Sequence, residues 1–535
     1  MSNARLKFWG WGYETERLTP EEVGRLEAAY ATRFGVSGFD ATPVPRAEEI
    51  DLRKPRVHVP ADLSEVCSSD HHERLLHSYG KSFFDSVRVF ARDFSNPPDV
   101  IAFPRSEAEL VRALDWSDSI DAVVIPWGGG SSVVAGVEPP RTDRPIVTID
   151  LKHLDRVLEI DKTSQAARIQ AGVYGPSLES QLKASGLTLR HFPQSFEFST
   201  LGGWIATRGG GHYATLYTHI DDFVESLRVV TPAGIMESLR LPGSGAGPSP
   251  DRMFIGSEGI LGIIAEAWMR LRPRPTFRAA TSARFQDFYR AADAVRSIAQ
   301  AQLYPANCRL LDADEALVNG AGDGTYCVLV LAFESADRPM DASLDRALEI
   351  VRAYGGRYDG AAPGAEGAQR RGAAGQWRDS FLRMPYNREV LTPRGIIAET
   401  FETAITWERF PQFHAQVKAA AEKAIEEVTG RPGLVTCRFT HVYPDGPAPY
   451  FSCHALGDKR RLMEQAWAIK TAASEALMKL GGTITHHHAV GRDHRRWYDR
   501  QRPDLFAKAL IAAKKRLDPR GILNPGVLVD PEMSD

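Results

Sequence analysis

The chain has 535 residues, more than the about 250–300 at which a single hydrophobic core stops growing, so two or three domains are expected. Its composition, with 43% hydrophobic and 25% charged residues, is that of a soluble globular protein. The formal net charge of −3 excludes the strongly basic character by which nucleic-acid-binding proteins are recognised.

The chain ends and the cysteines indicate an intracellular location. The first 18 residues lack the apolar core of a signal peptide, and the last seven, VDPEMSD, lack a peroxisomal tripeptide. No apolar run approaches the ~20 residues of a membrane span, since CVLVLAF at 327–333 has the length of a strand. The five cysteines share no CxxC spacing, which predicts reduced thiols. We therefore expect a cytoplasmic protein, with peripheral contact to a membrane left open.

Residues 1–96 form the first segment, for which a mostly helical structure is predicted. Its clearest element is an amphipathic helix over 20–34, PEEVGRLEAAYATRF. The proline and the two glutamates at its start are favoured in the first turn of a helix.

Residues 97–275 show a different pattern, in which short strands alternate with turns and helices. A strand over 99–103 precedes a helix over 106–114 that opens with the spacing of a capping box. A buried strand then runs directly into the glycines at 128–130. Further strands are predicted in PIVTIDL, AARIQAGVYG and ESLRVVTPAG, so this segment is expected to be a glycine-rich α+β domain.

Residues 276–482 contain two rounds of helices and strands. The first round has a helix over 284–302, strands in CRLLDADEA and TYCVLVLAF, and a helix over 341–355. The second round repeats this pattern, which predicts an antiparallel sheet with helices on one face. Between the rounds, residues 355–376 are rich in glycine and alanine, which predicts a mobile loop. Residues 483–535 form the last segment, whose turn-rich strip over 517–528 is expected to return to the first domain.

The glycines at 128–130 are the first candidate for a ligand site. Glycine lets the backbone approach a ligand, and successive N–H groups can form an anion-binding nest. A simple turn is the alternative, and the stretch is neither a Walker loop nor a Rossmann fingerprint. Three further stretches favour the ligand site: QSFEFSTLGGWIATRGGG at 194–211, IGSEGILGIIAE at 255–266, and the terminal ILNPG.

In this order and spacing the four stretches resemble the FAD-binding domain of the vanillyl-alcohol oxidase flavoprotein family. The resemblance implies that bound FAD faces a cap domain, for which residues 276–482 are the candidate. No histidine stands beside the first glycine loop, so non-covalent FAD is expected. For each glycine among the implied contacts, turn geometry alone is the alternative. The implied FAD contacts are Pro126, Trp127, Gly128, Gly129, Gly130, Ser131, Ser132, Gln194, Ser195, Phe196, Glu197, Phe198, Ser199, Thr200, Thr207, Arg208, Glu258, Gly259, Ile260, Leu261, Gly262, Ile263 and Ile264.

Three consecutive histidines, 486–488, stand in the stretch TITHHHAV. A metal site, a proton-handling site and an exposed loop are the candidates. We place the run at the final strand of the cap, where neighbouring side chains point to opposite faces, so only His486 and His488 would share a side. A metal site needs three or four ligands, and no metal is therefore predicted. The position just before the return to the first domain favours a role at the reaction centre.

Seven stretches together resemble the alkyldihydroxyacetonephosphate synthase family over almost the whole chain, from about residue 8 to about residue 528. They are FWGWGY, FEFSTLGGW, NCRLLD, WRDSF, TCRFT, YFSCHAL and HHHAVG. The resemblance implies that Tyr450 is the catalytic acid/base, that Arg378 holds a substrate phosphate, and that His486, His487 and His488 line the reaction centre. Arg309 matches an arginine that the family requires, whereas Arg438 receives no role.

These implied roles agree with the chemistry of the residues. Arginine supplies the permanent bidentate cation that a phosphate ester needs. A tyrosine, with a reference pKa near ~10, acts as a base only where neighbouring groups stabilise its anion, and imidazolium from the histidines is expected to do so. Ring packing of Tyr450 and surface ion pairs of the arginines are the alternatives.

The activity implied is an FAD-dependent, non-redox exchange of the acyl group of acyl-dihydroxyacetone phosphate for a long-chain alcohol, a step of ether-lipid synthesis. The flavin then acts as an electrophilic trap, and an apolar tunnel is required that the loop 355–376 would gate. A homodimer is expected. The sequence departs from the family pattern at Ser452, Ala489 and Ala398. The alternatives are an FAD-dependent dehydrogenase of a 2-hydroxy acid and a non-catalytic flavoprotein.

Overall fold

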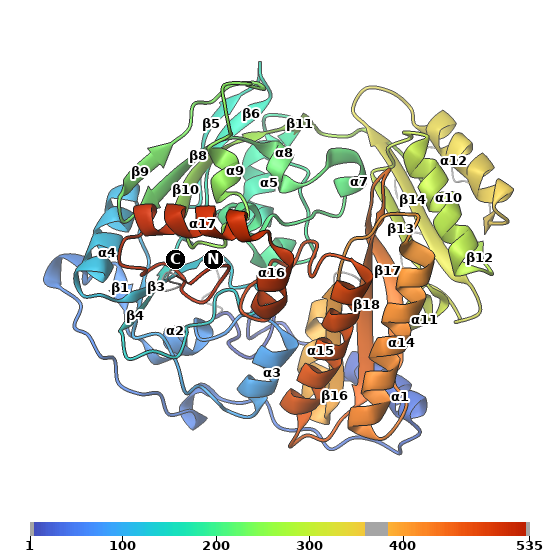
Figure 1. The fold of residues 1–535 in the computed structure, drawn as a ribbon, viewed down its shortest axis with the longest axis horizontal. Helices are drawn as coiled ribbons and strands as arrows, with labels where there is room; N and C mark the ends of the chain where they lie inside the picture. Colours follow the sequence, from blue (N-terminus) through green and yellow to red (C-terminus); the bar gives the residue numbers. More distant parts are fainter. Residues whose placement is uncertain (1–4, 359–382, 531–535) are drawn as a thin grey trace.

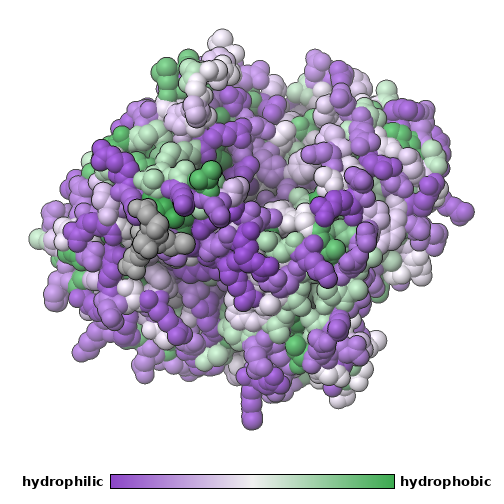
Figure 2. Space-filling view, viewed as in Figure 1, coloured by the Kyte–Doolittle hydropathy of each residue, from purple (hydrophilic) through white to green (hydrophobic). Residues whose placement is uncertain are grey.

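The computed structural model describes residues 5–358 and 383–530. Figure 1 shows two lobes side by side, with the glycine-rich domain on the left and a seven-stranded sheet with its helices on the right. Both chain ends of the described part lie in the left lobe, because the C-terminal segment crosses back to it. Polar side chains cover most of the face in this view, and apolar side chains form smaller patches between them (Figure 2).

The glycine-rich domain is built on two sheets. The first has the strand order β1 (Cys67–Ser68), β2 (Val100–Ala102), β4 (Ile146–Asp150) and β3 (Val123–Trp127). The second has the order β5 (Val157–Asp161), β6 (Ala166–Gln170), β10 (Ile263–Arg270), β8 (Val224–Thr231) and β9 (Gly234–Glu237). Helices α4 (Glu107–Ser119), α5 (Gly175–Lys183), α6 (Leu201–Thr207) and α17 (Asp504–Leu517) belong to the same domain.

The C-terminal strip pairs with the strand that carries the first glycine loop. The amide of Val124 donates to the carbonyl of Ile522 at 2.8 Å, and the amide of Asn524 donates to the carbonyl of Val124 at 2.8 Å. Asn524 thereby lies beside the glycine loop although almost 400 residues separate the two in the chain.

The cap domain is an antiparallel sheet of seven strands with helices on its outer face (Figure 1). Apolar side chains of those helices and of the sheet form one continuous core. The strand order is β15 (Arg357–Tyr358), β12 (Phe277–Phe285), β14 (Cys327–Ser335), β13 (Asn307–Leu311), β17 (Leu434–Val442), β18 (Pro447–Leu456) and β16 (Ile396–Glu402). The outer helices are α10 (Phe288–Gln300), α12 (Asp341–Ala353), α14 (Phe410–Thr429) and α15 (Leu462–Leu480).

The first segment contains the predicted helix but is not mostly helical. Helix α1 spans Pro20–Phe34, as predicted, and the Thr19 hydroxyl accepts the amide of Glu22 in a capping box. Beyond α1, only α2 (His71–Leu76) and α3 (Phe83–Phe90) are α-helical in residues 5–96. The rest is mostly irregular chain with two 3₁₀ turns and the short strand β1, because it lacks the helical spacing of apolar residues.

Three other predictions need correction or fall partly outside the described residues. The histidine run is not a strand, since residues 483–490 form an irregular loop after α15. In CRLLDADEA only the first part is a strand, and α11 (Ala313–Val318) follows it. Of the predicted mobile loop 355–376, residues 357–358 are the short strand β15, and the part from 359 onward lies outside the described residues.

Candidate active site

A cavity of about 310 Å³ lies between the glycine loops and the cap sheet. The glycine-rich domain contributes the loop at 128–133 and residues 193–195 and 199–200, and the cap contributes side chains of β16, β17 and β18. A second cavity of about 100 Å³ adjoins it, with Gly128, Ser132, Thr200 and Thr207 in both walls. Together they form one groove across the domain interface.

The first glycine loop has no room for side chains. A Cβ on Gly128 would stand 2.2 Å from the Thr200 hydroxyl oxygen, and one on Gly129 would stand 2.0 Å from the carbonyl oxygen of Phe198. Gly130 has a φ of 65°, in the left-handed region that glycine adopts without strain. The backbone itself therefore lines the groove, and the Thr200 hydroxyl is buried there with no hydrogen-bond partner among the described residues. This is a cradle for an extended ligand with hydrogen-bonding groups, which fits a dinucleotide.

Glu258 ties the second glycine stretch to the segment after the histidines. Its carboxylate accepts the amides of Val490 at 2.9 Å and Gly491 at 2.8 Å, and burial raises its pKa to about 7. The Asn524 side chain donates to the carbonyl of Glu258 at 2.8 Å. The 255–266 stretch, the histidine segment and the C-terminal strip thus meet at one point.

Most of the residues proposed to contact FAD line these cavities. Six do not. Ile260 and Leu261 are buried in the core of the domain, and Phe196, Glu197 and Phe198 form a short 3₁₀ turn outside the walls. Arg208 lies outside the groove, at a third cavity, and pairs with Asp221. The residues that line the groove are Pro126, Trp127, Gly128, Gly129, Gly130, Ser131, Ser132, Gln194, Ser195, Ser199, Thr200, Thr207, Glu258, Gly259, Gly262, Ile263 and Ile264.

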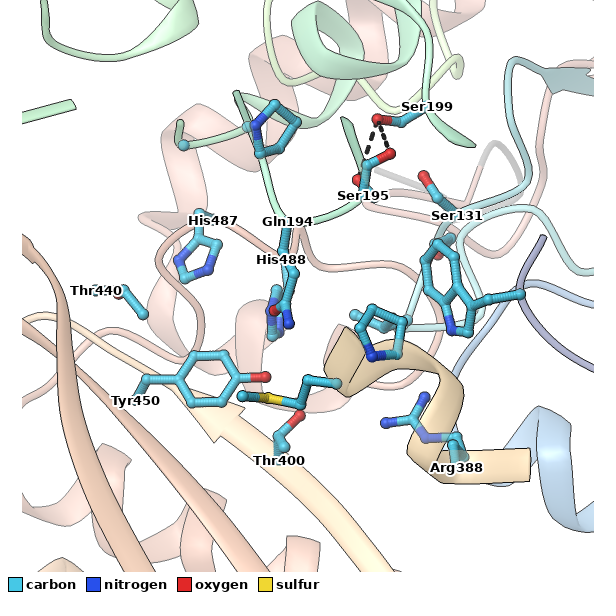
Figure 3. Close-up of a pocket in the computed structure, with 18 of the residues that line it drawn as sticks. Ser131, Gln194, Ser195, Ser199, Arg388, Thr400, Thr440, Tyr450, His487 and His488 are labelled. Carbon is cyan, nitrogen blue, oxygen red and sulfur yellow. Dashed lines mark hydrogen bonds between the residues drawn. The ribbon is translucent and has the colours of Figure 1, made fainter. Parts of the chain in front are cut away.

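Tyr450 extends from β18 into the larger cavity, opposite Gln194 and close to Thr400 (Figure 3). Burial raises the pKa of its phenol, while the cation of Arg438 opposes that rise. The Arg438 guanidinium lies 3.9 Å from the centre of the Tyr450 ring, and it forms a buried ion pair with Glu315. Arg438, to which the family resemblance gives no role, is therefore the cation nearest the phenol ring.

The three histidines of the loop are held by one buried carboxylate, that of Glu402 at the end of β16. It accepts the amides of His486 at 2.6 Å, His487 at 3.2 Å and His488 at 3.0 Å. Burial favours its protonated form, but His487 and His488 outweigh burial, and the pKa of Glu402 lies well below its usual range. The loop therefore has one defined conformation, with His487 and His488 in the wall of the cavity beside Tyr450.

The expected imidazolium support for Tyr450 is wrong for two of the three histidines. Burial lowers the pKa of His488 to about 3 and that of His486 well below its usual value. Both rings are neutral near pH 7, so positive charge beside the phenol comes from arginine instead.

Three arginines matter for an anionic substrate. Arg309 on β13 lines the cavity, and burial lowers its pKa to about 9. Arg388 lines the same cavity and lowers the pKa of Tyr450, although nothing in the sequence singled it out. Arg378, the residue predicted to bind phosphate, lies outside the described residues.

The irregular shape of the histidine loop brings three histidines of the chain together. His441 on β17 joins His486 and His487, and one ring nitrogen of each lies within 4.8 Å of the others. The strand alternation used to separate the histidines is therefore wrong. The Nδ1 atoms of His486 and His487 already form a hydrogen bond of 3.1 Å with each other, which occupies both atoms as ligands for a metal ion.

Two family models match the chain. Residues 98–240 match the FAD binding domain, and residues 274–528 match the C-terminal domain of FAD linked oxidases. FAD is thus the cofactor of this chain, in agreement with the cradle described above. Among the described residues, no helix combines the length and apolar character that a membrane crossing requires.

Several curated proteins are similar to the chain over most of its length. An alkyldihydroxyacetonephosphate synthase of Caenorhabditis elegans is 30% identical, covering 98% of this chain and 95% of its own. That of Dictyostelium discoideum is 29% identical, covering 92% and 84%. A glycolate oxidase subunit of Bacillus subtilis is 28% identical, covering 86% and 97%.

Solved structures agree with these relatives. An alkyldihydroxyacetonephosphate synthase structure superposes with a TM-score of 0.82 at 26% identity, covering 97% of this chain and 98% of that chain. A 4-ethylphenol oxidase from Gulosibacter chungangensis shares the fold, with a TM-score of 0.67 at 14% identity over 96% of this chain and 98% of that chain. The predicted fold class, an FAD-binding domain of the vanillyl-alcohol oxidase type with an antiparallel cap, is confirmed. The chain belongs to the alkyldihydroxyacetonephosphate synthase family of FAD-binding flavoproteins.

Proposed function

We propose that this protein replaces the acyl group of acyl-dihydroxyacetone phosphate with a long-chain alcohol, without net oxidation or reduction. The observation that carries the proposal is the placement of Tyr450 over Arg438 in the cavity that the first glycine loop also lines. An acid/base group and the cofactor cradle thus share one enclosed space.

The arginines of this cavity fit the substrate phosphate. Arg309 and Arg388 are both at its wall, and a guanidinium binds a phosphate through two parallel N–H donors. We assign the phosphate to this pair, with Arg378 as a further candidate. Arg438 and Arg388, both permanent cations, also favour the tyrosinate form of Tyr450 during proton abstraction beside the ketone.

The far end of the cavity fits a hydrocarbon chain. Leu26 and Tyr30 of α1 pack there against Leu391 and Ala398 of the cap. Ser452 and Ala398 are small, and they leave this end open where larger side chains would fill it. Acyl and alkyl chains would occupy this end in turn.

Residues 128–132 and 199–200 would hold FAD, which would supply an electrophilic centre for the exchange. The protein's own contribution is orientation by the arginines, proton transfer at the Tyr450 oxygen, and exclusion of water by the apolar wall. We propose further that FAD is held without a covalent bond, that the protein is a homodimer, and that it meets its substrate at a membrane surface.

Anaerobic mixing separates this proposal from the redox alternative. With acyl-dihydroxyacetone phosphate and a long-chain alcohol, the FAD-loaded protein should release fatty acid with no electron acceptor present and should end the reaction with yellow, oxidised flavin. A dehydrogenase of 2-hydroxy acids would instead be bleached by glycolate or D-lactate and would release no fatty acid. Bleaching by a hydroxy acid, with no fatty acid from the lipid, would overturn the proposal.

A further inference from the structure

A third cavity, of about 470 Å³, lies behind the histidine loop. Its wall includes His219, Tyr443 and His486, whereas His487 and His488 line the reaction cavity. Arg208 also lines it, with 61% of its side chain exposed, so this cavity opens to solvent. The loop is thus a partition between a site of proton transfer and bulk water.

A continuous chain of hydrogen bonds crosses this partition. The Nδ1 atoms of His487 and His486 are 3.1 Å apart, and Nε2 of His486 is 2.9 Å from the Tyr443 hydroxyl. The same hydroxyl bonds to Nε2 of His219. Four side chains therefore connect the wall of the reaction cavity with the wall of the solvent-facing cavity.

We propose that His487, His486, Tyr443 and His219 form a proton relay between the reaction cavity and solvent. The proposal rests on the proposed function, because the proton concerned is the one removed beside the substrate ketone. Of the four, only His487 lines the reaction cavity; His486, Tyr443 and His219 act through it, so they are positioning residues.

The relay conserves protons at every step. His487 passes a proton from Nδ1 to Nδ1 of His486, which releases one from Nε2 to the Tyr443 oxygen. Tyr443 releases its own proton to Nε2 of His219, and His219 gives one up to water in the third cavity. His486, Tyr443 and His219 each gain and lose one proton, and His487 takes up the proton released in the reaction cavity to replace the one it passed on. Reversal of the sequence returns a proton to the site.

The state of the groups suits this role. Burial lowers the pKa of His486 and of His219, so each ring is neutral and offers one donor and one acceptor. Burial raises the pKa of Tyr443, which keeps its phenol protonated between transfers. Glu402, the charged group nearest the loop, accepts the backbone amides and also lies 3.4 Å from Nδ1 of His487, where it favours the proton that His487 passes to His486.

Tyr443→Phe tests the relay in the FAD-loaded protein, because it removes the bridging hydroxyl and keeps the ring. Deuterium exchange of the hydrogen beside the substrate ketone should slow about tenfold or more, with KM unchanged. Added imidazole, small enough for the third cavity, should restore the rate. Tyr498→Phe is the matched control, since Tyr498 lines the same cavity outside the relay, and it should exchange like the parent protein. Unchanged exchange in Tyr443→Phe, or a loss that imidazole does not restore, would overturn the relay.

Nitrogen NMR of the imidazole rings gives a readout that needs no substrate. Tyr443→Phe should shift the ring signals of both His219 and His486, while Tyr498→Phe shifts neither. If both signals stay in place, the bridging bond is absent and the relay fails whatever the activity. If they shift but the parent protein does not convert acyl-dihydroxyacetone phosphate, the bonded chain is upheld and the proposed function fails.

Discussion

Glu402 and Tyr450 stand directly opposite each other in the antiparallel pair of β16 and β18. Side chains at such opposed positions project from the same face of a sheet. Glu402 uses its carboxylate to hold the amides of the histidine loop, and Tyr450 lines the cavity beside that loop. One pair of sheet positions thus sets the distance between the phenol and the imidazoles.

Replacement of Tyr450 by phenylalanine should abolish proton transfer and leave the cofactor in place. Turnover of acyl-dihydroxyacetone phosphate should fall by about 10²–10⁴-fold, the usual contribution of a positioned acid/base group. Flavin content, read from the visible spectrum, should not change. The control is Tyr304→Phe, at a tyrosine that is 49% exposed, which should keep full activity. Equal turnover in the two variants would contradict the role of Tyr450.

Glu402→Gln should loosen the histidine loop and lower stability. Loss of charge-assisted bonds to buried amides costs about 1.5–3 kcal/mol of unfolding free energy at pH 7. Because the folded-state pKa of Glu402 lies below its unfolded value, its contribution is full above about pH 4.3 and is lost as the pH falls through the folded pKa. Urea unfolding should therefore show a difference from the parent protein that shrinks towards low pH. The exposed Glu408→Gln should show no difference at either pH.

Arg438→Met should shift the pH dependence of catalysis to higher pH. Removal of the cation that opposes the rise in the pKa of Tyr450 makes its anion harder to form. The single variant also leaves Glu315 buried without its cation, at a cost of about 3–5 kcal/mol. The double variant Arg438→Met with Glu315→Gln should regain much of this stability and keep the alkaline shift in kcat/KM. An unmoved pH profile in the double variant would show that Arg438 serves packing alone.

Ala489→Gly should stabilise the fold. Ala489 has a φ of 74°, a left-handed conformation that costs a residue with a Cβ about 1–2 kcal/mol. Part of that gain is offset by the greater freedom of glycine in the unfolded chain, so a net gain of about 0.5–1 kcal/mol is expected. Ala419→Gly, at an exposed position inside α14, should destabilise by about the same amount. The two changes in melting temperature should have opposite signs.

Gly129→Ala should prevent FAD binding. The added Cβ would meet the Phe198 carbonyl oxygen at 2.0 Å, so the loop at 128–130 has to move out of its cradle. The purified variant should be colourless where the parent protein is yellow. Gly24→Ala on α1, where a Cβ meets nothing within 4 Å, is the control and should remain yellow.

The sequence predicts the cofactor cradle well because turn geometry is local. Gly129 belongs to a run of glycines that begins directly after a buried strand. Such a run indicates that the backbone there has no room for a Cβ. Helix α1 is predicted to the residue for the same reason, since Thr19 and Glu22 cap it within one turn.

The histidine site depends instead on contacts that are distant in the chain. Glu402 lies 84 residues before His486, and no spacing rule connects the two. Residues 483–490 are not paired in a β-sheet, so their side chains do not alternate between two faces as those of a strand do. Arg438 is hidden from sequence reasoning in the same way, because its neighbours Glu315 and Tyr450 come from other elements of the cap.

The most direct test is lipid mass spectrometry on the purified yellow protein, given acyl-dihydroxyacetone phosphate and a fatty alcohol under nitrogen. We expect alkyl-dihydroxyacetone phosphate and free fatty acid in equal amounts, no reduction of the flavin, and no product from Tyr450→Phe. Absence of the ether product from a protein with full flavin content, or its formation only with an electron acceptor, would contradict the proposed exchange.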